Sequence, residues 1–189
     1  MIPYEYITLP DTLNISEQKI KELNEKIPNV FKPENEDLGA IDRKGKSLKN
    51  SDCYTVPPIT ICNILGDDFL DIAYQLNKEH FGYSLYGQNY HQGFLYNVYS
   101  SDKQSEYKWH IDGTSNFVSD MKITLLADIS PEPYEGGEFW VNAGNPYHAK
   151  EFTIGSIMML KSHVLHRVTP VTKGKRISLT YFMEGPRFI

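Results

Sequence analysis

The chain has little cysteine, since Cys53 and Cys62 are the only two among 189 residues. Their spacing fits neither a thiolate metal clip nor a redox pair, and two residues cannot form a disulfide framework. We therefore interpret both as reduced structural thiols. Sequence alone gives no reason to expect a thiolate zinc site.

The chain also lacks an excess of positive charge and any long apolar run. Its net charge is −5, so we expect no nucleic-acid partner and no anionic membrane surface as a partner. No apolar run is long enough to cross a bilayer. The opening "MIPYEYITLP" lacks the basic and apolar regions of a secretory signal, which predicts a cytoplasmic location.

What the chain does have is a length and an aromatic content typical of one β-rich domain. A length of 189 residues predicts a single domain over 1–189, and the aromatic content of 13% favours strands. We expect a strand, helices and a loop over residues 1–82. Residues 83–189 are then the core.

The first part of the chain has a helical pattern between two prolines. Residues 1–9 predict a short strand closed by Pro10. "NISEQKIKELNEKI" predicts an amphipathic helix capped by Asn14 or Ser16 and ended by Pro28.

Residues 31–58 are polar with scattered Gly and Pro, which predicts a long loop or a marginal strand. Such a loop could be a substrate lid or only a disordered connection. "DDFLDIAYQLNKEH" then predicts a second amphipathic helix.

From residue 83 onward, short aromatic or β-branched segments alternate with turn residues. This texture predicts an antiparallel sandwich or barrel. In "PEPYEGGEF", a Gly-Gly turn is expected to join two strands as a hairpin. The fold class is therefore α+β, mainly β, with the N-terminal helices packed on one sheet.

The stretch "YKWHIDG" contains a candidate half of a metal site. A His-x-acid pair is expected about once by chance in a chain with 6 His and 24 acidic residues, so the pair needs corroboration. On a strand, His110 and Asp112 point to the same face about 7 Å apart along the chain, and Gly113 allows a sharp exit. Candidates for the third ligand are His148, His163 and His166.

Two His and one carboxylate on one face of an ion leave three coordination positions open. That arrangement suits non-heme Fe(II), which must bind a chelating co-substrate and dioxygen. Further along, Arg176 opens an apolar strand with Ser178 on the same face. Their donors suit a carboxylate, so a dicarboxylate could chelate the metal at one end and meet Arg176 at the other.

The whole ordered pattern resembles the Fe(II)/2-oxoglutarate-dependent dioxygenases, and within them the prolyl 4-hydroxylase-like branch that includes the PKHD-type hydroxylases. The resemblance covers about residues 83–186. It rests on "YKWHID", "KITLLADISPEPYEGGEFW" and "GSIMMLKSHVLHRVTPVTKGKRISLTYF".

This resemblance implies a double-stranded β-helix (jelly-roll) core. It makes His110, Asp112 and His166 the iron ligands and Arg176 the partner of the distal 2-oxoglutarate carboxylate. Ser178 would assist Arg176. Tyr99 resembles the family's tyrosine that hydrogen-bonds the co-substrate, with Tyr96 and Tyr107 as nearby alternatives, whereas Ala127 and Asp128 stand where the family often has another tyrosine.

The activity implied by the resemblance is hydroxylation of a C–H bond, with Fe(II), 2-oxoglutarate and dioxygen, release of succinate and carbon dioxide, and ascorbate as a candidate reductant. A prolyl residue in a peptide or protein is the first substrate expected, and a free amino acid or other small metabolite is the alternative. Two further alternatives are a non-catalytic jelly-roll binding module and a cupin-like metalloenzyme that would not need Arg176. The oligomeric state is left open.

Several residues near the motifs are expected to be structural. We interpret His163 as a polar residue at a strand edge, and His148 and His91 as surface or packing residues. Trp109 and Trp140 are expected in the core or the pocket wall, and Glu138 at the end of the Gly-Gly hairpin.

Overall fold

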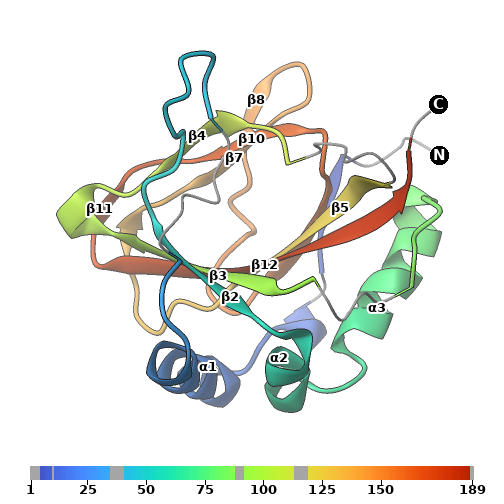
Figure 1. Ribbon diagram of the computed structural model, residues 1–189, viewed down its shortest axis with the longest axis horizontal. Helices are drawn as coiled ribbons and strands as arrows, with labels where there is room; N and C mark the ends of the chain where they lie inside the picture. Colours follow the sequence, from blue (N-terminus) through green and yellow to red (C-terminus); the bar gives the residue numbers. More distant parts are fainter. Residues whose placement is uncertain (1–4, 10, 35–40, 88–91, 113–118, 188–189) are drawn as a thin grey trace.

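A computed structural model describes residues 5–9, 11–34, 41–87, 92–112 and 119–187. It confirms the jelly-roll expectation, because two antiparallel sheets face each other (Figure 1). The larger sheet has the order β1-β9-β5-β12-β3-β2, and the smaller has the order β4-β10-β7-β8. A two-stranded ladder of β11 and β6 completes the described strands.

The strands of the larger sheet are β1 (Tyr6–Thr8), β2 (Asp52–Val56), β3 (Phe94–Ser100), β5 (Ser119–Asp128), β9 (Ile157–Lys161) and β12 (Lys175–Pro186). Those of the smaller sheet are β4 (Tyr107–His110), β7 (Phe139–Asn142), β8 (Pro146–His148) and β10 (Leu165–Val168). The short ladder pairs β6 (Glu135–Gly136) with β11 (Val171–Lys173).

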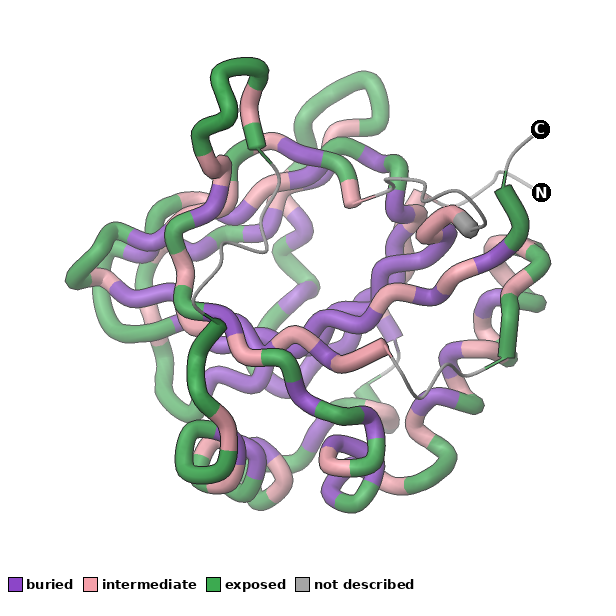
Figure 2. The backbone as a smooth tube through the Cα atoms, viewed as in Figure 1, coloured by how far each residue is buried: buried purple, intermediate pink, exposed green. Residues whose placement is uncertain are grey.

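The central strands of the larger sheet are buried on both faces (Figure 2). Successive side chains on a strand point to opposite faces, so each strand serves two environments. On β12, Ile177 and Leu179 pack in the core cluster that includes helical residues, whereas Arg176 and Ser178 line the cavity between the sheets. This alternation brings polar groups to an interior site without breaking the core.

Three helices cover the outer face of the larger sheet, which is the layout expected for the N-terminal part (Figure 1). They are α1 (Glu17–Val30), α2 (Pro58–Leu65) and α3 (Phe69–Leu76), and α3 continues into a π-helical turn, η2 (Asn77–Phe81). Short 3-10 turns occur at η1 (Asp11–Leu13) and η3 (Ser101–Lys103).

The expected boundaries of the first helix and strand need correction. Helix α1 starts after Ser16, whose side chain accepts a hydrogen bond from the Lys19 amide, and it continues through Pro28 to Val30. Proline there removes one backbone hydrogen bond from the last turn, and only two helical residues follow it. The first strand is shorter than residues 1–9, since β1 begins at Tyr6, and Pro10 lies outside the described residues.

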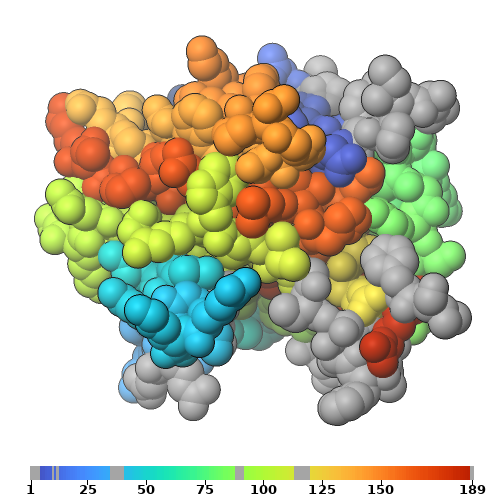
Figure 3. All heavy atoms as spheres, turned by 90° about the horizontal axis from the view of Figure 1, so that it is seen from above, coloured from blue at the N-terminus to red at the C-terminus, as the bar shows by residue number. Residues whose placement is uncertain are grey.

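Of the two alternatives for residues 31–58, a long loop or a marginal strand, the second half confirms the strand. Strand β2 pairs with β3, and the start of helix α2 follows. Residues 41–50 lie beside β4 (Figure 3). The Lys108 amide donates to the Leu48 carbonyl at 2.9 Å, and Lys49 forms an isolated antiparallel β-bridge with Tyr107. Residues 35–40 are not among those described.

The Gly-Gly turn does not form the expected hairpin. Strand β6 pairs with β11, and β7 pairs with β10, so Gly136 and Gly137 connect two different sheets. Both have positive φ, 71° and 62°. A Cβ on Gly137 would lie 3.0 Å from Cδ of Arg176, so glycine here leaves space for that side chain.

Candidate metal centre and co-substrate pocket

His110, Asp112 and His166 come together between the sheets, from two neighbouring strands. Strand β4 ends at His110, Asp112 follows it, and β10 places His166 directly opposite His110. The three potential ligand atoms all lie within 4.8 Å of one another. Nε2 of His110 is 3.5 Å from Asp112 Oδ1, and Nε2 of His166 is 3.3 Å from Oδ2.

Each imidazole is oriented by the backbone. Nδ1 of His110 lies 2.7 Å from the Lys108 carbonyl, and Nδ1 of His166 lies 2.8 Å from the Val164 carbonyl. A carbonyl oxygen only accepts, so Nδ1 carries the proton and the Nε2 lone pairs are left for a metal. The Tyr107 ring stacks on His110 with centroids 3.3 Å apart, which further fixes that ring.

The Asp112 carboxylate is held by hydroxyl groups that the sequence did not reveal. Thr124 on β5 donates to Oδ2 at 2.8 Å, and its hydroxyl also contacts that of Ser162 at 2.9 Å. The Asp112 amide donates to the Ser162 carbonyl at 2.9 Å. No motif could have identified Thr124, because it becomes a neighbour of Asp112 only through sheet packing.

The electrostatics of the cluster favour a bound cation. Burial by itself raises the pKa of Asp112, but the charges and hydrogen bonds of His166 and His110 outweigh it and hold the pKa far below its ordinary value. Burial lowers the pKa of His166, but Asp112 raises it by more, so the pKa lies above its ordinary value. The pKa of His110 is lowered, mainly by burial. The permanent negative charge of Asp112 therefore attracts a proton, or a metal ion in its place.

Arg176 lines the same cavity as the three potential ligands. The cavity has a volume of about 1040 Å³ and also contains Ser178 and Tyr99. Arg176 is 1% exposed, and its Nη1 donates to the Ser178 hydroxyl at 3.4 Å. Its guanidinium lies 5.4 Å from the centre of the Tyr99 ring, its register partner on β3.

The surroundings of Arg176 include two residues without an expected role there. Burial lowers the pKa of Arg176, but Tyr134 and Asp128 raise it further than burial lowers it. The Tyr134 hydroxyl donates to Asp128 Oδ2, and the other carboxylate oxygen accepts from Ser130. Tyr134 belongs to the "PEPYEGGEF" motif, so its sequence position was a usable signal.

Sequence comparison agrees with this geometry. Residues 94–184 match the model of the 2OG-Fe(II) oxygenase superfamily. The chain is 29% identical over 98 residues to a PKHD-type hydroxylase of Nitrosomonas europaea, and 37% identical over 75 residues to one of Gloeothece citriformis.

These matches cover 48% and 38% of this chain, and 43% and 34% of the respective relatives. The chain thus matches less than half the length of these curated relatives. Among the residues that the structure describes, no helix is long and apolar enough to span a bilayer.

Solved structures with the same fold include prolyl hydroxylases. A prolyl-4-hydroxylase of Pseudomonas putida superposes with a TM-score of 0.66 at 15% identity, covering 98% of this chain and 94% of that one. A Trichoplax adhaerens prolyl hydroxylase, solved with a hypoxia inducible factor peptide fragment, gives 0.64 at 14% identity, covering 95% and 83%. At such identities, the likeness shows the oxygenase fold.

The residues present fit the two groups for which the superfamily is named. Two imidazole nitrogens and a carboxylate, converging from one side, are the donor set that Fe(II) takes while keeping positions open. The buried guanidinium of Arg176 has no carboxylate within 4.0 Å among the described residues, so its donors suit an anion that enters the cavity. A dicarboxylate such as 2-oxoglutarate would supply that anion.

Other candidate residues lie elsewhere. His163 is exposed in the turn between β9 and β10, not at a strand edge, and His91 is outside the described residues. The half-buried Trp109 and Trp140 flank Arg167, at 4.9 and 5.4 Å from its guanidinium carbon, and neither lines the cavity.

His148 stacks on Trp140, which confirms its packing role. Glu138 is exposed and accepts a hydrogen bond from Nε1 of Trp140 on β7.

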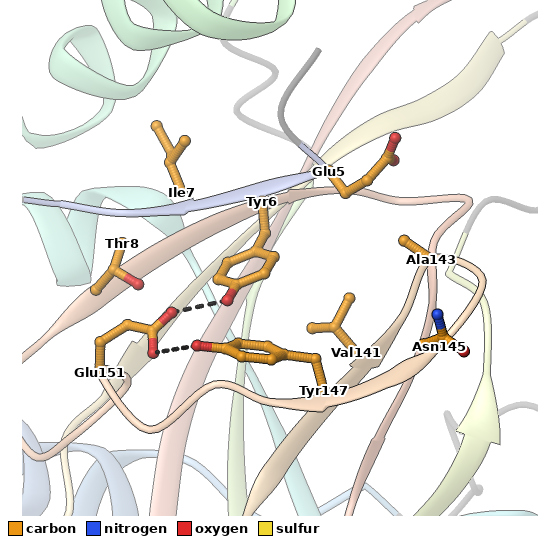
Figure 4. A pocket seen from close by; sticks show the side chains of 9 residues that line it. All are labelled: Glu5, Tyr6, Ile7, Thr8, Val141, Ala143, Asn145, Tyr147 and Glu151. Carbon is orange, nitrogen blue, oxygen red and sulfur yellow. Dashed lines mark hydrogen bonds between the residues drawn. The ribbon is translucent and has the colours of Figure 1, made fainter. Parts of the chain in front are cut away.

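A second hollow lies between β1 and the β7–β8 hairpin (Figure 4). Of its two carboxylates, Glu151 accepts from the hydroxyls of Tyr6 at 2.8 Å and Tyr147 at 3.5 Å, and Glu5 pairs with Nζ of Lys161 at 3.4 Å. The hollow shares no lining residue with the cavity that holds the three potential ligands. Because both carboxylates have partners within the protein, this hollow does not offer a second metal site.

Proposed function

We propose that this chain is an Fe(II)- and 2-oxoglutarate-dependent hydroxylase, with a prolyl residue in a peptide or protein as its first-choice substrate. The observation that carries the proposal is that the three-donor cluster and buried Arg176 line one cavity. The names of the relatives and neighbours, PKHD-type hydroxylases and prolyl hydroxylases, support the substrate choice. In this proposal residues 1–189 act as one catalytic unit.

His110, Asp112 and His166 would hold Fe(II), and Arg176 with Ser178 would bind the distal carboxylate of 2-oxoglutarate. Tyr99, beside Arg176 in the cavity, would complete that end of the pocket. When bound, the two groups supply oxidation of a C–H bond by dioxygen, with release of succinate and carbon dioxide. The protein orients the ligands through backbone carbonyls and Thr124, and its apolar walls keep bulk water from the reacting centre.

The first test is anaerobic addition of Fe(II) and 2-oxoglutarate to the purified protein. A weak visible charge-transfer band of the chelate is expected, and its absence in the wild type would refute the proposal. Arg176→Ala is expected to remove 2-oxoglutarate-dependent turnover. Unchanged turnover in that variant would favour a cupin-like enzyme that works without this co-substrate.

The second test is succinate release across proline-containing peptides and free amino acids. A non-catalytic binding module would release no succinate above background with any of them. A free amino acid or another small metabolite is the second candidate substrate, because a buried lysine, Lys49, adds a second charged anchor to the cavity.

A further inference from the structure

Lys49 is a buried cation in the wall of the metal cavity. Its side chain comes from residues 41–50, outside the jelly roll, yet the residue is only 7% exposed. Nζ donates to the Asn97 side-chain oxygen at 2.6 Å and lies 5.6 Å from the centre of the Tyr107 ring. Tyr107 in turn stacks on His110, so one ring lies near both the ammonium group and a candidate metal ligand.

Among the residues that the structure describes, this ammonium group has no counterion. Among the described residues, no carboxylate lies within ion-pair distance of Lys49, and the one hydrogen bond uses a single donor of three. Burial of an unpaired charge is unfavourable, so such groups are usually paired with an opposite charge. The remaining donors of Lys49 therefore suit an anion that enters the cavity from solution.

The charge balance of the cavity favours the substrate as the source of that anion. Its lining has three cationic side chains, Arg43, Lys49 and Arg176, against the single carboxylate Asp112. Under the proposed function, Fe(II), Asp112, Arg176 and doubly charged 2-oxoglutarate sum to zero. The charges of Lys49 and Arg43 then remain, although the whole chain carries a net charge of −5.

The size and layout of the cavity also leave room for a second ligand. A volume of about 1040 Å³ reaches the upper end of pockets for drug-sized ligands, more than a five-carbon dicarboxylate needs. Arg176 faces Tyr99 across the β3–β12 pair, and Asn97, which holds Lys49, lies two residues further along β3. Asn97 faces Ser178, in the direction of Thr124 and Asp112, so Lys49 is held about 7 Å along the strand from Arg176 toward the metal ligands.

We infer that Lys49 binds a carboxylate of the substrate to be hydroxylated and so selects acidic substrates. This inference rests on the proposed function and specifies the substrate class of the same site. The carboxylate could belong to an Asp or Glu side chain beside the reacting residue of a peptide, or to the α-carboxylate of a free amino acid. Both offer the same chemistry to the ammonium group.

The test uses two matched pairs of probes with the protein, Fe(II) and 2-oxoglutarate under anaerobic conditions, where nothing turns over. The first pair is the end-blocked peptides Gly-Glu-Pro-Gly and Gly-Gln-Pro-Gly, and the second is L-proline and L-prolinamide. Binding is measured by calorimetry for the wild type, Lys49→Met, Lys49→Arg and Lys44→Met. Lys44 is an exposed lysine of the same segment that does not line the cavity, so it controls for loss of charge alone.

The wild type is expected to bind the acidic member of at least one pair tenfold or more tightly than its neutral partner. Lys49→Met should abolish that preference with neutral probes unaffected, Lys49→Arg should retain most of it, and Lys44→Met should leave it unchanged. A preference confined to the peptide pair identifies an acidic side chain as the source, and one confined to proline identifies the α-carboxylate.

Three results would overturn the inference. The wild type could bind no acidic probe, Lys49→Met could keep the preference, or Lys49→Met could require tenfold more 2-oxoglutarate to saturate the charge-transfer band. The last result would make Lys49 a co-substrate ligand. Absence of the charge-transfer band in the wild type would instead refute the proposed function. The band reports binding of Fe(II) and 2-oxoglutarate, whereas calorimetry reports binding of the probes.

Discussion

His110 and His166 lie directly opposite each other across the β4–β10 pair, and both direct Nε2 at the carboxylate of Asp112. The facing register, together with the backbone carbonyls that hold each Nδ1, brings the three donors together before any metal binds. Such preorganisation makes the cluster sensitive to single substitutions.

His166→Ala is expected to lower Fe(II) affinity by well over tenfold and to remove the chelate band, because one of three protein donors is lost. The matched control is His163→Ala, three residues earlier in an exposed turn, which should keep the band. Anaerobic titration with Fe(II) and 2-oxoglutarate measures both. The opposite pattern would mean that His163 is the ligand.

Thr124→Val should weaken metal binding about 10- to 100-fold, the usual effect of removing a partner that orients a ligand. The valine keeps the shape of the side chain but leaves Oδ2 of Asp112 without its 2.8 Å donor. Thr124→Ser retains a hydroxyl and should behave almost as the wild type. Calorimetry with Mn(II) gives the affinities, and equal affinity for Val and Ser would contradict the role.

Metal affinity should rise with pH in the range above 6.5. In the metal-free protein Asp112 raises the pKa of His166 above its ordinary 6.5, and a metal ion must displace that proton. Calorimetry with Mn(II) at pH 7 in buffers of different ionisation heat should detect proton release. If the binding heat does not depend on the buffer, the expectation fails.

The stability of the metal-free protein should change in the opposite direction. The stabilisation due to protonated His166 is fully present below pH 6.5 and is lost as pH rises through its raised pKa. His166→Gln should lack this decline, which urea unfolding between pH 5.5 and 8.5 can measure. An identical pH dependence in both proteins would assign the decline to other groups.

Gly137→Ala should lower both stability and 2-oxoglutarate affinity. Its φ of 62° costs about 1–2 kcal/mol for an L-residue, and the new Cβ would press on Arg176 Cδ at 3.0 Å. Gly45→Ala is a matched control, since its φ of 76° is also positive but no atom lies within 4 Å of the added Cβ. Urea unfolding and saturation of the chelate band by 2-oxoglutarate compare the two variants. Equal effects would show that contact with Arg176 is unimportant.

The sequence by itself determined the parts of this protein that depend on local order. Alternating strands after residue 83 predicted the two-sheet core, and the spacing of His110 and Asp112 predicted two donors on one side of an ion. The ordered motifs then indicated His166 and Arg176, and the structure brings both into the cavity with the first pair. Strand periodicity determines which face a side chain occupies, so the pairing of His110 with Asp112 needed no long-range information, whereas His166 and Arg176 were implied by the family resemblance.

Tertiary structure alone decided which residues surround those groups. Lys49 reaches the cavity because its segment lies beside β4, and Thr124 reaches Asp112 because β5 belongs to the sheet that faces β4. The Gly-Gly stretch looked like a hairpin turn, but pairing with β10 and β11 separated its two strands into different sheets. Contacts of this kind join residues 12 or more positions apart, and no local pattern in the chain encodes which strands will pair.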